Sequence, residues 1–558
     1  MITPCRQCQT DFEVTAEDKE FYQKVSPIFK GISYHLPSPT FCPECRAQRR
    51  LAFRNERKFY TRQCALCTKD IISIHRTTNP VTVYCQRCWW SDRWDPLSYG
   101  RDFDFSRPFF EQFEDLYQTV PQIALMNDNG VASENCEYTQ DFAFGKNCYL
   151  AIASWKVKDC MYCDAVYNSA DIVDSTNIVS GSELVYESIH SLNLYSCAFL
   201  ALSENCSNCW FGLDLKGCKD CFCCFGLRQK QYCIFNQPYS ESEYKEKVQT
   251  FDTGSYQGLE TIKAQFTEWL KQFPKKYLHM SNCEESLGDN LINCKNTFSF
   301  DLLKAEHCKY YVRGEDAQWC YDIHQSGCLQ WCYEGITPDN AYMALFTLWC
   351  WKSKFTLYSD NCHSSEHVFG CTGLKRGNYC ILNKQYTKEA YEELAARIIQ
   401  HMKSTNEWGE FFPISLSPFP YNDTLAQEHY PLTQEVAKKR AIRFEEEPLK
   451  ESIESISNDL PDNIKNIPDS IFKETLSCLT CNKNYRLIEQ ELAFYRKMQL
   501  PIPRKCFHCR HFERLKRQNP RQLFARNCSE CDISLMTTYP LVREPKVLCE
   551  PCYNKRVY

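Results

Sequence analysis

The 558-residue sequence has no apolar segment long enough to cross a bilayer. A membrane-spanning helix needs about 20 apolar residues, whereas the longest apolar run covers only residues 343–351. This run predicts a buried strand. The opening residues 1–8 contain no apolar signal-peptide stretch. We therefore expect a protein without membrane association, in a reducing cytoplasm.

The sequence also lacks an excess of one charge and the common catalytic motifs. Its 65 Lys and Arg against 70 Asp and Glu give a net charge of −5, which excludes a globally basic nucleic-acid binder but allows a local basic face. There is no P-loop, GxGxxG or GxSxG motif. His363-Ser-Ser-Glu-His367 matches the HxxEH pattern of inverse zincin proteases. It lies within strand-like sequence, where the two imidazoles would not face one ion.

Cysteine is abundant instead, with 38 residues. Sixteen of them form CxxC pairs, four pairs near each end, and in both sets 18 residues separate the second pair from the third and 17 the third from the fourth. Tight pairs of this kind suit thiolate ligation better than long-range disulfides. The pairs are Cys5/Cys8, Cys42/Cys45, Cys64/Cys67, Cys85/Cys88, Cys478/Cys481, Cys506/Cys509, Cys528/Cys531 and Cys549/Cys552.

We expect four structural zinc ions, each held by two successive pairs. Two CxxC turns supply the four thiolates of a closed zinc site, with no open position for catalysis. Between Cys67 and Cys85, residues 70–75 and 81–84 predict a hairpin, and a helix is expected after Cys88. This order is typical of a treble clef and favours sequential pairing; interleaved, RING-like pairing is the alternative.

The two ends match beyond their cysteines. Phe21-Tyr22 follows Cys8 by 13 residues, and Phe494-Tyr495 follows Cys481 by 13 residues. Arg46 and Arg510 each follow the second CxxC pair. We therefore interpret the ends as a duplicated double-zinc module.

These motifs carry a family resemblance. Cys5-x-x-Cys8, Phe21-Tyr22 and Cys42-Pro-Glu-Cys45-Arg46 resemble a probable zinc-ribbon (treble-clef) family that is widespread in bacteria. Almost the whole chain resembles a family of uncharacterised zinc-ribbon proteins common in candidate-phylum bacteria with reduced genomes, through residues 49–57, 99–105, 408–413 and 553–558. The resemblance implies an architecture and no activity.

The middle of the chain has a 12-residue period that is itself duplicated. Cys136, Cys148 and Cys160 are 12 apart, and the period continues through Cys197 to Cys233 after a one-residue slip. Asn135, Asn147, Asp159 and Asn205 precede several of the cysteines. Similar sequences recur 147 residues later, where Cys308, Cys320 and Cys332 keep the period. Each unit of 12 is predicted to be one coil of a narrow β-solenoid, or half a coil of a wider one, with a helix closing each copy.

The predicted fold is therefore multidomain, with small α+β zinc modules flanking a duplicated, mainly β, solenoid-like core that carries capping helices. The expected domains are an N-terminal double-zinc module (1–98), a first repeat unit (99–280), a second repeat unit (281–403), a connector rich in proline and acidic residues (404–474) and a C-terminal double-zinc module (475–558). The 22 central cysteines are interpreted as small buried side chains. Metal or cluster ligation by Cys160/Cys163, Cys206/Cys209 and Cys218/Cys221, and redox-active thiols, are the alternatives.

A basic arm follows the second CxxC pair of each module, interleaved in the first with Phe53, Phe59 and Tyr60. Clustered arginines beside aromatic residues suit phosphate contact and base stacking; a solvated helix face paired with the acidic connector is the alternative. The candidate nucleic-acid-binding residues are Arg46, Arg49, Arg50, Arg54, Arg57, Lys58, Arg510, Arg514, Lys516, Arg517 and Arg521.

The function expected from the sequence is that of a non-enzymatic, structural-zinc protein that binds RNA or a ribonucleoprotein through these arms. A protein-interaction scaffold that uses the solenoid faces is the first alternative. An enzyme or redox protein that uses the central cysteines is the second.

Overall fold

A computed structural model describes residues 1–127, 132–310, 312–314, 321–322, 324–326, 332–336, 342–446, 460–542 and 545–558. The chain divides into two compact units, each built from two separate stretches of sequence. The first unit comprises Met1–Asn129 and Met280–Glu446, and the second comprises Gly130–His279 and Glu447–Tyr558. No described helix is long and apolar enough to cross a membrane.

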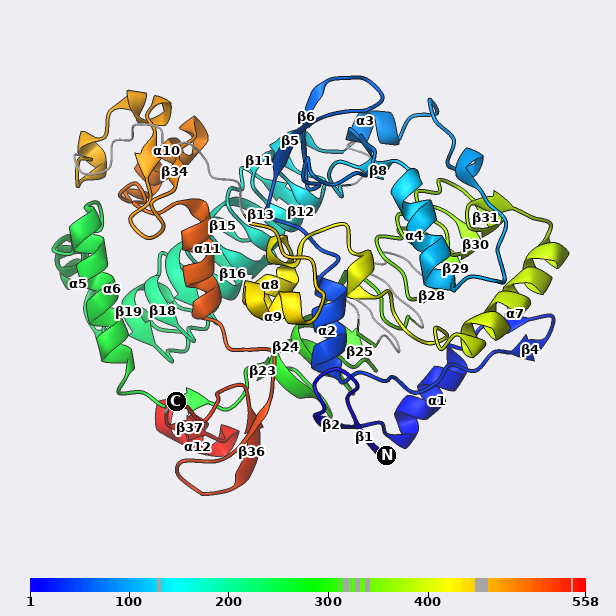
Figure 1. Cartoon of the computed structure of the whole chain (residues 1–558). Helices are drawn as coiled ribbons and strands as arrows, with labels where there is room; N and C mark the ends of the chain where they lie inside the picture. The colour runs from blue at the N-terminus through cyan, green and yellow to red at the C-terminus, as the bar shows by residue number, and fades with distance from the viewer. Residues whose placement is uncertain are drawn as a thin grey trace. The chain divides into compact units, whose positions relative to one another are not determined.

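The second unit contains the first solenoid, a stack of parallel strands coloured cyan to green in Figure 1. Lys146 pairs with Glu134 and with Lys158, so one 12-residue stretch makes one full coil. Ala170 pairs with Glu183, so this coil is one residue longer than the others, which explains the one-residue slip in the period. The strands are β9 (Glu134–Glu137), β10 (Gln140–Ala143), β11 (Lys146–Tyr149), β12 (Ile152–Lys158), β13 (Asp164–Val173), β14 (Thr176–Val179), β15 (Glu183–Tyr186), β16 (Ile189–Ala201), β17 (Glu204–Ser207), β18 (Trp210–Leu213), β19 (Lys219–Phe225) and β20 (Gln231–Ile234).

Each coil bends at every third residue, because one residue in three is left-handed. Asn135, Asn147, Asp159 and Asn205 all have φ between 52° and 54°, a region that Asn and Asp enter more readily than most residues. The residue after each bend points inward. The buried cluster of this solenoid accordingly consists of residues spaced by multiples of three, apart from the slip: Phe142, Cys148, Ala151, Val157, Cys160, Cys163, Val166, Ile172, Ile178, Val185, Leu194, Cys197, Leu200, Cys206, Cys209, Leu215, Cys218, Cys221, Cys224 and Cys233.

The inward positions favour small side chains that donate a hydrogen bond. The Cys163 thiol donates to the carbonyls of Met161 (3.2 Å) and Ile172 (3.1 Å). At an equivalent position, the Ser154 hydroxyl donates to the Ile152 carbonyl at 2.8 Å. Cysteine and serine therefore fill the same role in the narrow interior.

The first unit contains the second solenoid. Its first described coils have 11 residues, as Leu287 pairs with Phe298, and later coils have 12, as Lys354 pairs with Glu366. The predicted position of Cys320 in the period lies outside the described residues. The strands are β23 (Met280–Ser281), β24 (Leu287–Lys295), β25 (Phe298–Glu306), β26 (Val312–Gly314), β27 (His324–Ser326), β28 (Tyr342–Leu345), β29 (Lys354–Leu357), β30 (Glu366–Phe369) and β31 (Asn378–Ile381).

An asparagine side chain closes the last coil of each solenoid. Asn383 accepts a hydrogen bond from the Thr372 N–H (2.9 Å) and donates to the Thr372 carbonyl (2.8 Å), as a further strand would. Asn236 makes the same pair of bonds with Phe225. A short strand and a helix follow in each copy: β21 (Gln237–Pro238) and α5 (Glu241–Gln249) in the first, β32 (Lys384–Gln385) and α7 (Lys388–Ser404) in the second.

The cysteine-rich modules are small, and their strands pair only locally. The predicted hairpin of residues 70–75 with 81–84 is wrong: β6 pairs with β5, which directly precedes the Cys64/Cys67 turn, and β7 pairs with β8. The N-terminal elements are β1 (Ile2–Pro4), β2 (Asp11–Glu13), α1 (Ala16–Lys24), β3 (Ile28–Phe29), β4 (Ile32–Ser33), α2 (Pro43–Leu51), β5 (Tyr60–Gln63), β6 (Asp70–Ser73), β7 (Val83–Tyr84), α3 (Gln86–Trp89), α4 (Phe109–Thr119) and β8 (Gln122–Ile123).

The C-terminal module repeats this plan. Its elements are β33 (Leu476–Ser477), β34 (Asn484–Tyr485), α10 (Glu489–Met498), α11 (Phe507–Lys516), β35 (Phe524–Asn527), β36 (Ser534–Thr537), β37 (Val547–Leu548) and α12 (Glu550–Val557). The remaining α-helices and strands are α6 (Tyr256–Leu270) and β22 (Lys275–Lys276) in the second unit and α8 (Leu425–His429) and α9 (Gln434–Lys439) in the first.

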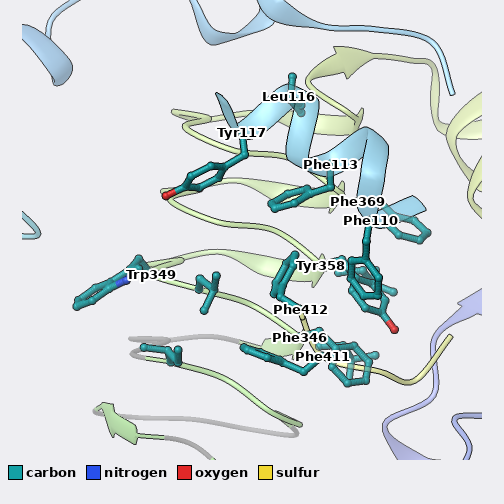
Figure 2. Packing of buried hydrophobic residues seen from close by; sticks show 14 of the residues in the cluster. Phe110, Phe113, Leu116, Tyr117, Phe346, Trp349, Tyr358, Phe369, Phe411 and Phe412 are labelled. Atoms are coloured by element: carbon teal, nitrogen blue, oxygen red, sulfur yellow. The ribbon is translucent and has the colours of Figure 1, made fainter. Parts of the chain in front are cut away.

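Each module belongs to the unit of the solenoid that is more distant from it in the sequence. The N-terminal module packs on the second solenoid, and the C-terminal module packs on the first. Helix α4, within the range expected to form the first repeat unit, also lies on the second solenoid: Phe109 contacts Tyr358 (5.4 Å between ring centroids) and Phe369 (5.5 Å). Figure 2 shows the neighbouring rings of Phe113, Tyr358 and Phe412, and the ring centroids of Phe113 and Phe412 lie 4.8 Å apart.

We predict that Asn383→Ala destabilises the first unit by about 2–4 kcal/mol, because it leaves a buried N–H and carbonyl of Thr372 without partners. Urea denaturation of the full chain measures the loss. Asn378→Ala, at an exposed position of the same coil, is the control and should change stability by less than about 0.5 kcal/mol. Equal effects of the two substitutions would contradict the edge-closing role of Asn383.

Candidate metal centres

Four groups of four cysteines place their sulfur atoms within 4.8 Å of one another. The groups join successive CxxC pairs, so the predicted sequential pairing is confirmed and the interleaved pairing is wrong. They are Cys5, Cys8, Cys42 and Cys45; Cys64, Cys67, Cys85 and Cys88; Cys478, Cys481, Cys506 and Cys509; and Cys528, Cys531, Cys549 and Cys552.

The same local fold builds all four groups. In the second group, the Thr68 N–H donates to the Cys64 carbonyl and the Cys64 N–H to the Lys69 carbonyl, and Thr68 has a φ of 60°. This closes a tight turn that aims two thiols at one point. The other two thiols come from the start of a helix, where Cys42, Cys85, Cys506 and Cys549 are the N-caps of α2, α3, α11 and α12.

The sulfur spacing fits one tetrahedral ion and no disulfide. Sulfur-to-sulfur distances between the two halves of the groups are 3.7 Å for Cys8–Cys42, 3.9 Å for Cys67–Cys85, 3.7 Å for Cys481–Cys506 and 3.6 Å for Cys531–Cys549. A tetrahedron with metal–sulfur bonds of ~2.3 Å has edges of ~3.8 Å, whereas a disulfide is ~2.05 Å long. With four thiols and no open position, each site suits a structural metal.

In three of the four sites, backbone N–H donors favour the ionised form of the first cysteine. Burial raises the pKa of Cys64, but the N–H groups of Cys85, Cys67 and Leu66 together lower that pKa to about 6. The pKa values of Cys478 and Cys528 are about 6 for the same reason. These thiols are therefore ionised at neutral pH, the form that binds metal.

The two helices that start at the second CxxC pairs of the first and third sites, α2 and α11, dock the modules onto the solenoids. We call them the docking helices. On α2, Arg46 Nε lies 2.6 Å from Asp322 Oδ2, and Arg50 Nη2 lies 3.2 Å from Asp322 Oδ1. Arg49 Nη2 lies 2.9 Å from Glu334 Oε2. All of these side chains are buried.

Helix α11 makes the same contacts in the second unit. Arg510 Nε lies 3.0 Å from Asp174 Oδ2, and Arg514 Nη1 lies 2.9 Å from Asp174 Oδ1. Arg514 also reaches Glu187 at 3.3 Å. Burial opposes the charge of Arg510, but Asp174 foremost holds its pKa well above the ordinary value. Both helices therefore keep charged arginines in a dry interface because solenoid carboxylates pair with them.

The solenoid residues that receive the arginines form one corner row in each copy. Tyr162, Asp174 and Glu187 occupy successive coils of the first solenoid, and their counterparts in the second are Tyr310, Asp322 and Glu334. All six have φ between 46° and 65°, so each sits at a bend with its side chain outward. The tyrosines stack under the arginines, with Arg510 4.7 Å from the Tyr162 ring centroid and Arg46 5.5 Å from that of Tyr310.

The structure places most of the predicted nucleic-acid-binding residues inside these interfaces. Six of the eleven are buried, namely Arg46, Arg49, Arg50, Arg54, Arg510 and Arg514. Arg57 and Lys58 are half-buried, Arg57 against Glu428. Lys516 and Arg517 are exposed, Arg517 with Nη2 2.8 Å from Glu187, and Arg521 is half-buried. The solvent-facing arm expected from the sequence is thus mainly a docking surface, because carboxylates of the solenoid neutralise it.

The central cysteines line the solenoid interiors. Among the described residues, only the four terminal groups have metal-binding geometry, and Cys160/Cys163, Cys206/Cys209 and Cys218/Cys221 are not among them. Burial raises the pKa of Cys160 and of Cys163. Neutral thiols that donate to carbonyls are the form suited to packing.

The HxxEH motif is divided between two faces of the second solenoid. His363 is buried against Trp90 (5.0 Å) and Trp351 (4.8 Å). The ring of His367 stacks between Phe355 (4.5 Å) and Tyr379 (4.8 Å). The two imidazoles thus pack in separate aromatic stacks, as expected for strand spacing.

Sequence reasoning missed the corner row. Asp174 and Asp322 are 148 residues apart, and Glu187 and Glu334 are 147 apart, which matches the 147-residue spacing of the duplication to within one residue. The sequence did contain a signal for this contact: an acidic pair recurs in both solenoid copies, and a basic pair recurs in both modules. No family model, curated protein or solved structure matches the chain, so the resemblance to zinc-ribbon families stays a prediction.

We predict that Asp174→Ala costs the second unit about 3–5 kcal/mol, because Arg510 and Arg514 would stay buried without their partner. Urea denaturation of the full chain measures the change. Asp171→Ala is the matched control: Asp171 pairs with Lys497 at 3.0 Å on the surface, where a pair contributes at most about 1 kcal/mol. A loss below 1 kcal/mol for Asp174→Ala would show that the ion pairs do not hold the module.

Proposed function

We propose that the protein is a non-enzymatic binding scaffold whose two solenoids are held by four structural zinc ions. Zinc is the metal favoured by a tetrahedral set of four thiolates. The observation that carries the proposal is that Cys42 and Cys506 are at once metal-site residues and the N-caps of the docking helices. Zinc would fix the start of each helix, and each helix presents its arginines to a solenoid. The metal would therefore stabilise the contact between each solenoid and its module by fixing the docking helix.

An enzymatic role is not favoured by the same geometry. The closed sites offer no position for a substrate or water, and the inward thiols of the solenoids are buried and bonded to carbonyls. The coils, in contrast, offer long flat rows of outward side chains at strand spacing. Such regular surfaces suit the binding of an extended partner.

One outward row of the first solenoid favours RNA or a ribonucleoprotein as the partner. Strand pairing aligns Lys146, Lys158, Ala170, Glu183 and Tyr195 along successive coils. Both lysines are exposed and make only surface ion pairs, Lys146 with Glu134 at 2.9 Å and Lys158 with Asp159 at 3.6 Å, and Tyr195 is 54% exposed. Phe144, two residues before Lys146, is 53% exposed. An exposed ring near a lysine, as at Phe144 and Lys146, suits base stacking with phosphate contact.

Zinc content tests the structural part of the proposal. Purified protein should contain about four zinc ions. The Cys509→Ser variant should contain about three, and its helix α11 should exchange amide hydrogens faster, because the start of the helix is no longer held by the metal. Cys163→Ser is the control, since serine occupies equivalent inward positions, and should keep about four ions. A full zinc content in Cys509→Ser would contradict the assignment.

RNA binding is tested by fluorescence anisotropy with single-stranded oligouridylate. Lys146→Glu/Lys158→Glu should weaken binding at least 10-fold at low salt, because it reverses two charges of the row. Lys516→Glu, on the exposed end of the C-terminal arm, is the comparison that locates the surface. If the unsubstituted protein does not bind RNA, the scaffold would instead bind a protein partner. If Lys516→Glu weakens binding more than the double variant does, the RNA site lies on the C-terminal arm and not on the solenoid row.

A further inference from the structure

The two docking helices are copies whose sequences differ in charge at two aligned positions, 49/513 and 53/517. Arg46 and Arg50 of α2 correspond to Arg510 and Arg514 of α11, each 464 residues later. Between them, however, Arg49 corresponds to Glu513. In the first unit, Arg49 Nη2 lies 2.9 Å from Glu334, and its Nη1 lies 3.2 Å from Glu410.

Helix α11 supplies the equivalent cation from another position. Glu513 is exposed and pairs with Lys505 at 2.6 Å. Glu187, the counterpart of Glu334, is reached by Arg517 at 2.8 Å. Arg517 comes four residues after Glu513, directly at the end of the helix.

The first module carries an aromatic residue where the second carries this arginine. Phe53 corresponds to Arg517 and is buried, with ring-centroid distances of 6.0 Å to Phe411 and 6.2 Å to Phe412. Glu410, from the same short segment, completes the environment of Arg49. In the first unit, the N-terminal module thus meets Glu334 of the second solenoid together with Glu410, Phe411 and Phe412 of the connector. In the second unit, Arg517 meets Glu187 of the first solenoid beside solvent.

We propose that residues 49 and 53 of the N-terminal module, and 513 and 517 of the C-terminal module, form a pairing code that directs each module to its own solenoid. On the second solenoid, the C-terminal module would place Glu513 against Glu334 and Glu410, two like charges in a buried setting. It would also place Arg517 in the aromatic pocket of Phe53. Both changes reject the wrong module.

The pairing of modules with solenoids runs against the order of these parts along the chain. The N-terminal module directly precedes the first solenoid, and the C-terminal module follows the second, so tethering alone raises the local concentration of the wrong partner. Arg46 and Arg50 pair with Asp322 in the same way as Arg510 and Arg514 pair with Asp174, so these shared contacts do not select one corner row over the other. Only the residues that differ between the copies distinguish the two solenoids.

Zero-length carbodiimide crosslinking of the full-length, zinc-loaded protein reads the pairing directly. Lys309 lies 3.8 Å from Glu17, and Lys497 lies 3.0 Å from Asp171. Each pair joins a module to its own solenoid, and mass spectrometry measures the yield of each crosslink. Far-UV circular dichroism and zinc content show whether each variant is folded.

Two comparisons decide the proposal. The double variant Glu513→Arg/Arg517→Phe, at two exposed positions, gives the C-terminal module the residues of the N-terminal module. It should lower the yield of the Lys497–Asp171 crosslink at least twofold and produce new crosslinks from this module to the second solenoid. The control Arg517→Ala keeps Glu513 and should show the native crosslink alone. Independently, Arg49→Glu should lower the Lys309–Glu17 crosslink at least fivefold more than Arg49→Ala. Native crosslinks at unchanged yield in the double variant, or equal yields in Arg49→Glu and Arg49→Ala, would overturn the code.

Discussion

The interaction on which each unit depends is a buried carboxylate shared by two arginines. Asp322 pairs with Arg46 and Arg50, and Asp174 pairs with Arg510 and Arg514. Removing charges from water is costly, and the cost is offset only when the geometry is good and both partners are present. These ion pairs therefore require a fixed geometry on both sides. The bends of the solenoid must hold the aspartate outward, and the metal site must hold the start of the helix.

The cysteines serve two separate purposes that depend on the surrounding backbone. At the ends, two backbone turns bring four thiols to one point, and N–H groups favour the ionised form. In the solenoids, one residue in three points inward, and where it is a cysteine its thiol donates to a backbone carbonyl, as serine does at equivalent places. The same residue is thus a ligand in one setting and a small packing group in the other, because only the first setting gathers four sulfurs.

Much of the fold could be predicted from spacing alone. The CxxC intervals identified four sites, and the 12-residue period identified the coils, because both depend on local geometry that repeats with the sequence. The Asn and Asp residues before the cysteines were visible signals of the left-handed bends. The hairpin of residues 70–75 with 81–84 failed because β6 and β7 pair with strands on either side, and nothing in those residues encodes a partner outside the segment.

The sequence by itself determined what each part is: two double-cysteine modules, two solenoids, and a basic helix beside the first and third metal sites. Only the tertiary structure decided which parts meet. It buried Arg46, Arg49, Arg50, Arg510 and Arg514, which the sequence offered as a surface for RNA, because the neutralising carboxylates lie more than a hundred residues away at solenoid corners. Local spacing specifies turns and coils, whereas the choice of partner depends on charges that come together only when the chain has folded.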